Sequence, residues 1–131
     1  MSTELLAAMP FAETLGIELD SAAPEAVRGG LAWSAERCTA GGILHGGALM
    51  ALADSLGGLC AYLNLPDGAT GTATIESKMN FFRGVAGGRV SAVSRPLHVG
   101  RATIVVETDL RDDDDRHVAR VTQTQAVLAP R

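Results

Sequence analysis

The chain has 131 residues, of which 47% are hydrophobic, 20% are charged and 4% are aromatic, and its formal net charge is −4. This length fits one domain that buries roughly two-thirds of the surface exposed by its unfolded form. The apolar share excludes a disordered chain, and the acidic balance argues against a nucleic-acid-binding protein, because phosphate binding requires a basic surface. Cys38 and Cys60 lack the spacing of a disulfide scaffold or a CxxC site, so reduced thiols are expected.

The longest hydrophobic stretch, residues 43–63, approaches the roughly 20 residues that span a bilayer. His45 and Asp54 interrupt it, and an Asp at the centre of a span costs about 2.5–3.5 kcal/mol on insertion. A helix buried in a soluble fold is therefore favoured over a membrane span. The first ten residues lack the basic start and long apolar run of a secretory signal, so we expect a cytoplasmic protein.

The N-terminal half predicts a short helix, two strands and a long helix. Residues 5–11 favour the short helix, and residues 15–20 and 27–35 favour two strands around a turn at Pro24. After a glycine-rich loop, leucines recur at spacings of three and four up to a turn at Asn64, which is the pattern of one helical stripe. Alanines occupy the other faces, so we expect other structure to surround this helix. The stripe consists of Leu49, Leu52, Leu56, Leu59 and Leu63.

After Gly68 the sequence alternates with a period of two, which is typical of β-strands. The alternation predicts that Ile75 and Ser77 face one side of a strand and that Thr74 and Glu76 face the other. Short turns between successive strands indicate an antiparallel meander. The four predicted strands are residues 72–81, 89–98, 103–110 and 117–128.

One long helix and a curled antiparallel sheet make an α+β architecture, in which the sheet wraps around the central helix. We expect residues 1–131 to form a single domain of this kind. A single sheet covers only part of an apolar helix, so a second copy of the chain is expected to complete the burial, most simply in a two-fold homodimer.

A histidine and two glycines, His45-Gly46-Gly47, stand where the loop turns into the long helix. The first amides of a helix have no intrahelical acceptor, and the helix dipole adds about half a positive charge there. The glycines leave room for a ligand to approach these amides, an arrangement that would stabilise an oxyanion. The alternative is a tight loop in which His45 is only a cap or core residue.

Asp54 lies in an otherwise apolar segment, ALMALADSLGG, where an unpaired buried carboxylate is costly. It follows His45 by nine residues, which places the two side chains on opposite faces of one helix. They are not expected to meet within one chain. Two helices that run antiparallel across a two-fold axis would bring His45 of one subunit near Asp54 of the other, which predicts a shared active site. The alternative for Asp54 is a structural hydrogen bond to a neighbouring loop.

The segment LHGGALMALADS, preceded by Gly42 and followed by MNFFR, GRVSA and VGRATIVVETDL, resembles the hotdog-fold thioesterases. The closest group is the PaaI-like type of the 4-hydroxybenzoyl-CoA thioesterase superfamily. The resemblance covers residues 11–128, nearly the whole chain. It implies the hotdog fold and hydrolysis of an acyl-CoA thioester to a free acid and CoA. CoA is then part of the substrate, and no metal or other cofactor is implied.

The resemblance also assigns roles to single residues. In such enzymes the acid on the long helix, here Asp54, attacks the thioester carbonyl or activates a water molecule. The amide of Gly46 holds the carbonyl oxygen, and His45 orients or polarises the same group. Thr39 stands where the family usually has Asn or Gln, and its hydroxyl is the expected replacement donor. Gly58 stands where many relatives have Ser or Thr.

The segment from Lys78 to Arg101 contains five basic residues, and the next acid is Glu107. The forked donors of arginine suit the pyrophosphate and 3′-phosphate of CoA. The resemblance places the nucleotide near residues 98–101 and the start of the last strand. The acidic run at 112–115 is expected to be a solvated turn, because it lacks the spacing of an EF-hand. The residues expected to bind CoA are Gly47, Arg83, His98, Val99, Gly100, Arg101, Arg116, His117 and Arg120.

Two alternatives to a thioesterase stay open. One is an acyl-thioester hydratase or dehydratase on the same fold. The other is a non-catalytic acyl-CoA-binding module. Thr39 and Gly58 keep this alternative open, because both depart from the residues usual in the family. The sequence does not identify the acyl group. It also does not distinguish a dimer from a dimer of dimers. Neither a nucleic acid nor a membrane is an expected partner.

Overall fold

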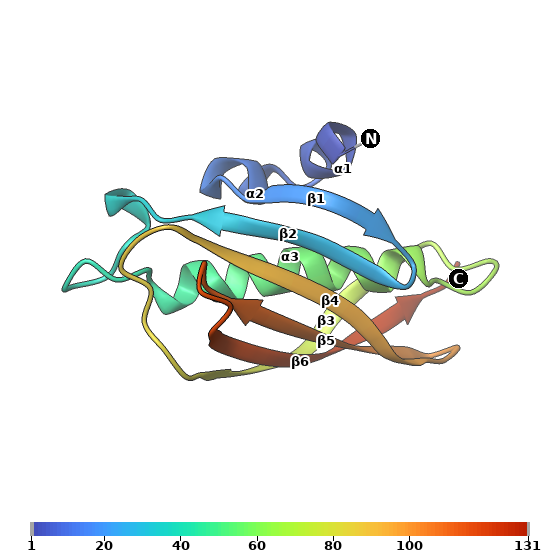
Figure 1. Cartoon of the computed structure of the whole chain (residues 1–131). Coiled ribbons are helices and arrows are strands. Elements are labelled where there is room, and N and C mark those ends of the chain that lie inside the picture. The colour runs from blue at the N-terminus through green and yellow to red at the C-terminus, as the bar shows by residue number, and fades with distance from the viewer. Residues whose placement is uncertain (1, 131) are drawn as a thin grey trace.

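The computed structural model describes residues 2–130, in which a six-stranded antiparallel sheet curls around one long helix (Figure 1). The long helix, α3 (Gly46–Leu63), lies in the hollow of the sheet. The expected architecture of a curled sheet around a central helix is confirmed. The remaining elements are α1 (Ser2–Ala7), α2 (Pro10–Leu15), β1 (Glu18–Ala23), β2 (Ala26–Ala32), the 3-10 turn η1 (Ala35–Arg37), β3 (Gly71–Phe81), β4 (Arg89–Val99), β5 (Thr103–Arg111) and β6 (His117–Leu128).

The N-terminal segment forms two short helices, so the prediction of one helix over residues 5–11 is wrong. Met9 has φ −123° and ψ 78°, outside the helical region, and Pro10 opens α2. Proline disfavours helical geometry in the residue before it but fits the first position of a helix. Gly16 then ends α2 in the left-handed conformation, with φ 87°. The first strand therefore begins at Glu18, three residues later than predicted.

The strand order is β1-β2-β4-β5-β6-β3, and every neighbouring pair is antiparallel. Strands β4, β5 and β6 form the expected meander. The prediction that β3 belongs to the same series of hairpins is wrong, because β3 pairs with β6 while β2 pairs with β4. Residues 82–88 carry the chain from one edge of the sheet to its middle. β3 is consequently an edge strand, and no other strand of residues 2–130 pairs with its outer side.

A β-bulge in β3 changes which side chains face the helix. Thr74 pairs with Gln125 and Glu76 pairs with Thr124, so Ile75 is an extra residue without a partner. Thr74 therefore lies on the inner face of the sheet, like Ser77 farther along the strand. The prediction from strict alternation, which placed these two residues on opposite faces, is wrong.

The core forms where α3 meets the inner face of the sheet. Leu52 and Leu56 are fully buried, whereas Met50 and Tyr62 on the other side of the helix are exposed. The helix is thus covered on one side only in the single chain. Its 18 residues have a mean hydropathy of 1.3, enough to cross a membrane by length and composition, and half of them are buried. This packing is that of a core helix.

Two adjacent glycines of α3 have different surroundings. A Cβ at Gly57 would lie 2.1 Å from Oε1 of Gln123, which is fully buried on β6. A Cβ at Gly58 would meet nothing within 4 Å. Gly57 is therefore required by the packing of helix on sheet, and Gly58 is not.

This difference predicts opposite effects on stability. Gly58→Ala is expected to raise the free energy of unfolding by up to about 1 kcal/mol, because alanine favours the helix. Gly57→Ala is expected to lower it by about 1–3 kcal/mol, because the added methyl group overpacks the interface with Gln123. Urea denaturation followed by circular dichroism measures both. Equal effects of the two substitutions would contradict the packing described for Gly57.

Candidate active site

His45 caps the N-terminus of α3. Its Nδ1 accepts a hydrogen bond from the N–H of Gly47 at 2.7 Å. Because Nδ1 is the acceptor, the proton of the neutral imidazole lies on Nε2. The ring is exposed, so the Nε2–H group is available to a ligand. A loop that contains Gly41 and Gly42, both with positive φ, leads the chain into this cap.

The N–H of Gly46 is an open donor at the same helix end. The N–H groups of Ala48 and Leu49 bond to the carbonyl of His45, and that of Gly47 bonds to the imidazole. Among the described residues, no acceptor is found for the N–H of Gly46. The geometry thus suits the oxyanion role expected for Gly46. Gly47 is expected to bind CoA, but its N–H already bonds to the imidazole of His45. The ring of Phe81 borders this point, 3.2 Å from where a Cβ of Gly46 would lie.

Asp54 lies in the third turn of α3 and is exposed in the single chain. The expectation that this carboxylate is buried in an apolar core is wrong for one chain. The leucines around it in the sequence turn toward the sheet, while Asp54 projects beside β3. At about 1.5 Å per residue it stands about 13 Å along the helix axis from His45, on the opposite face. One chain therefore does not bring these two side chains together.

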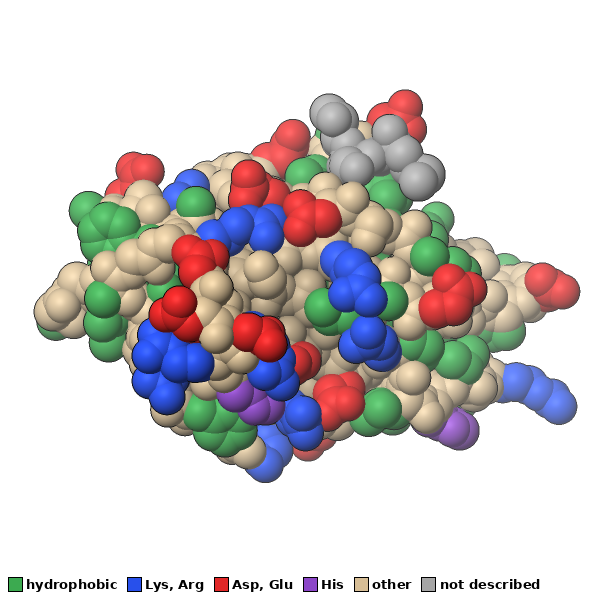
Figure 2. Space-filling view, viewed as in Figure 1, with side chains coloured by type: hydrophobic (Ala, Val, Ile, Leu, Met, Phe, Trp, Pro, Cys, Tyr) green, Lys and Arg blue, Asp and Glu red, His purple; other side chains and the backbone are tan. Residues whose placement is uncertain are grey.

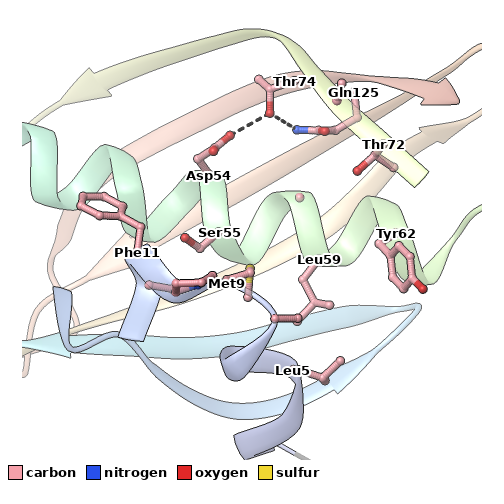
Figure 3. A pocket seen from close by; sticks show the side chains of 15 residues that line it. Leu5, Met9, Phe11, Asp54, Ser55, Leu59, Tyr62, Thr72, Thr74 and Gln125 are labelled. Atoms are coloured by element: carbon pink, nitrogen blue, oxygen red, sulfur yellow. Dashed lines mark hydrogen bonds between the residues drawn. The ribbon is translucent and has the colours of Figure 1, made fainter. Parts of the chain in front are cut away.

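Three side chains from the sheet hold the Asp54 carboxylate, as Figure 3 shows for two of them. The hydroxyl of Thr74 donates to Asp54 Oδ1 at 2.9 Å, and Gln123 Nε2 donates to the same oxygen at 3.3 Å. Gln125 Nε2 donates to Thr74 Oγ1 at 2.6 Å. None of these three residues was predicted from the sequence to belong to the site. The available signal was a pair of glutamines two positions apart on the inner face of the last strand.

An apolar cavity of about 680 Å³ opens beside Asp54 (Figure 3). The short helices α1 and α2 form one wall, and α3 and the start of β3 form the other. Gly58 lies in the second wall and contributes no side chain, which keeps the cavity wide. The side chains in its lining are mainly apolar and include Leu5, Met9, Phe11, Leu59 and Tyr62.

The two cysteines are poorly placed for nucleophilic catalysis. Cys60 is buried in the core, and burial raises the pKa of its thiol to about 11. The thiolate is therefore scarce near neutral pH. Cys38 is half-buried and donates to the carbonyl of Ser34. Within residues 2–130, no group of three or more His, Cys, Asp or Glu side chains is arranged to share a metal ion.

Thr39 lies on the exposed loop before α3. Its N–H bonds to the carbonyl of Ile43, which closes the loop two residues before His45. The described structure shows no hydrogen bond from its hydroxyl. The role expected for Thr39 stays a prediction.

The residues expected to bind CoA fall at two ends of the sheet. The exposed hairpin between β4 and β5 contains His98, Val99, Gly100 and Arg101. Arg116 directly precedes β6, and residues 117–120 begin it. The nine residues of β5 separate these groups by about 30 Å. One chain therefore does not bring the two groups together. The N–H of Arg83 bonds to the carbonyl of Val118, which places Arg83 at the end where β6 begins.

Several of these basic side chains already have acidic partners. Arg116 pairs with Asp112 and Asp114, Arg120 with Glu107, and His117 with Asp109. Acidic and basic groups accordingly lie side by side on the face in Figure 2, without a continuous basic patch. Among the described residues, no ion pair involves Arg83 or Arg101. These two side chains are the more available phosphate partners.

A family model described as the thioesterase superfamily matches residues 41–119, more than half of the chain. The chain belongs to the thioesterase superfamily. Its curled sheet around a long helix is the hotdog fold that the resemblance implied. The PaaI-like group within the superfamily stays a prediction.

Individual members of the thioesterase superfamily are similar over most of the chain. A putative esterase of Pseudomonas aeruginosa is 40% identical over 92 residues, which cover 69% of this chain and 63% of that protein. The 1,4-dihydroxy-2-naphthoyl-CoA hydrolase of Escherichia coli K12 is 34% identical over 87 residues, or 66% of this chain and 63% of that enzyme. The matched region thus spans less than two-thirds of these curated relatives.

Solved structures of the superfamily match more completely. The structure of a mutant of the Pseudomonas aeruginosa thioesterase superposes with a TM-score of 0.90 at 31% identity, covering 98% of this chain and 94% of that one. A putative esterase of Mycobacterium tuberculosis gives a TM-score of 0.89 at 27% identity, with 94% and 99% covered.

The cap predicts a structural role for His45 that is separable from chemistry. His45→Ala is expected to lower the free energy of unfolding by about 1 kcal/mol, because Gly47 loses its acceptor. His45→Asn is expected to stay within a few tenths of a kcal/mol of the parent protein, because asparagine caps helices well. Urea unfolding of the three proteins measures the difference. An alanine variant as stable as the parent would refute the cap.

Proposed function

We propose that this chain is an acyl-CoA thioesterase, which hydrolyses an acyl-CoA thioester to a free acid and CoA with Asp54 as the catalytic carboxylate. The observation that carries the proposal is an exposed carboxylate at the mouth of an apolar cavity, fixed by hydrogen bonds to one of its oxygens. The cavity suits a hydrophobic acyl group. The Escherichia coli relative, named as an acyl-CoA hydrolase, supports this substrate class.

Two routes use the same carboxylate. As a general base, Asp54 takes a proton from a water molecule whose oxygen bonds to the thioester carbon. As a nucleophile, it bonds to that carbon and forms an anhydride, which water then hydrolyses. In both routes the C–S bond breaks, the CoA thiolate leaves and takes up a proton, and the acid is released. The N–H of Gly46 stabilises the oxyanion, and Nε2–H of His45 polarises the carbonyl.

The proposal places each active site between two copies of the chain. Asp54 lies on one face of α3, and the donors of His45 and Gly46 lie on the opposite face. Neither group alone makes a complete active site. β3 leaves its outer edge open, and Met50 and Phe81 are exposed apolar groups on α3 and β3. A two-fold homodimer with antiparallel α3 helices covers this surface and brings the donors of one chain to Asp54 of the other. Arg83 and Arg101 are the proposed phosphate partners for CoA.

The first test replaces the carboxylate. Asp54→Asn is expected to lower kcat/KM by at least about a hundredfold, because neither general-base nor nucleophilic catalysis remains. Release of CoA thiol from a panel of aryl and aliphatic acyl-CoAs, read with a disulfide reagent, measures the rate. Acyl-CoA binding by calorimetry is expected to survive. Full activity of the variant would remove Asp54 from the mechanism, and binding without turnover by the parent chain would favour a binding module.

The second test addresses the shared site. Mixed dimers of Asp54→Asn and His45→Ala subunits are expected to recover about a quarter of the parental activity. Random exchange makes about half of the dimers mixed, and each mixed dimer has one intact site of two. Activity is measured after subunit exchange, with the mixed dimers verified by mass spectrometry. No recovery in verified mixed dimers would show that each site belongs to one chain.

A further inference from the structure

Two fully buried glutamines stand on the inner face of β6. Gln123 and Gln125 are two positions apart, so both point toward α3, next to the buried Val121. Burying an amide costs free energy unless its polar atoms find partners. Both amides direct their Nε2 groups to the same place, where Thr74 and Asp54 meet.

The direction of these hydrogen bonds follows from chemistry. Gln125 Nε2 carries only donor hydrogens, so Thr74 Oγ1 accepts from it at 2.6 Å. The one hydrogen of the hydroxyl is then free for Asp54 Oδ1, 2.9 Å away. If the amide of Gln125 were reversed, its oxygen would compete with the carboxylate for that hydrogen. The order of donation is therefore Gln125 to Thr74 to Asp54.

Gln123 adds a second donor to the same oxygen. Its Nε2 lies 3.3 Å from Asp54 Oδ1, and its own Oε1 is buried without a hydrogen-bond partner in the described structure. A buried carbonyl without a partner is unfavourable, and a leucine or methionine at this position would avoid that cost. The contact with Asp54 accounts for an amide in a place where stability alone favours an apolar side chain.

The bulge in β3 makes this arrangement possible. With regular alternation through Ile75, Thr74 and Ser77 would lie on opposite faces, and Thr74 would point away from α3. The extra residue puts the Thr74 hydroxyl on the inner face, opposite Gln125. Bulges occur next to active sites where they turn a side chain toward its target.

We infer that Thr74, Gln123 and Gln125 are positioning residues, which hold Oδ1 of Asp54 and leave Oδ2 as the oxygen that acts on water or the thioester. The inference rests on the proposed function of Asp54. Thr74 and Gln123 touch the carboxylate, and Gln125 touches the Thr74 hydroxyl. Thr74 and Gln125 also line the apolar cavity, so the test needs a change that keeps the shape of the side chain and removes only the hydrogen bond.

The decisive variants change one hydroxyl. Thr74→Val keeps the shape of the side chain and removes the donor, and it is expected to lower kcat about ten- to a hundredfold with KM within about threefold. Thr74→Ser restores the hydroxyl and is expected to keep kcat within about threefold of the parent. Thr122→Val is the matched control, because Thr122 is an exposed threonine of the neighbouring strand β6, two positions from Thr124. Steady-state hydrolysis of the best acyl-CoA substrate measures all three.

The outcomes separate this inference from the proposed function. If the parent chain hydrolyses acyl-CoA and Thr74→Val keeps its kcat, or raises KM instead, the positioning role is overturned. Failure of Thr74→Ser to recover activity also overturns it. If the parent chain hydrolyses no acyl-CoA, the proposed function fails. Urea unfolding of Thr74→Val, Asp54→Ala and the double variant then decides alone: non-additive shifts of the midpoint support the contact, and additive shifts overturn it.

Discussion

The site depends on a contact between helix and sheet, in which one oxygen of Asp54 accepts hydrogen bonds from Thr74 and Gln123. The packing of Leu52 and Leu56 against the sheet sets the height and rotation of α3. That packing in turn carries Asp54 to the inner edge of β3. A substitution that shifted the helix by one ångström would move the carboxylate away from its donors. The geometry of the site therefore depends directly on the packing of the core.

The same helix holds apart the groups that the proposed reaction needs. Its N-terminus offers an open amide at Gly46 and a ring N–H at His45, while the carboxylate stands more than two turns away on the opposite face. A straight helix cannot bend these groups together. A two-fold partner that runs antiparallel solves the problem without any distortion, because each helix then supplies a different half to each of two sites. Exposure of Asp54 in one chain fits such an assembly.

The sequence pattern predicted the features that are determined by residues close together in the chain. The leucine stripe predicted α3, and period two predicted the later strands, since each face repeats within a few residues. The cap at His45 could be predicted for the same reason. Two features depend on distant partners and were missed. The pairing of β3 with β6 has no local signal, and the bulge at Ile75 shifts alternation by one residue, which hid Thr74 from the site. The apolar neighbours of Asp54 suggested burial because composition does not say which face a residue occupies.

In the proposed function, specificity and catalysis depend on different parts of the fold. The carboxylate and its donors lie on α3, β3 and β6, which the core and the sheet hydrogen bonds hold rigidly. One wall of the apolar cavity comes from α1 and α2, helices of six residues each, separated by the break at Met9. Short helices at the edge of a domain open more readily than core elements. Under the proposed function, changes in this wall alter which acyl group fits while the carboxylate stays in place. Gly58, which leaves the opposite wall open, adds space that a larger residue would remove without touching the hydrogen bonds to Asp54.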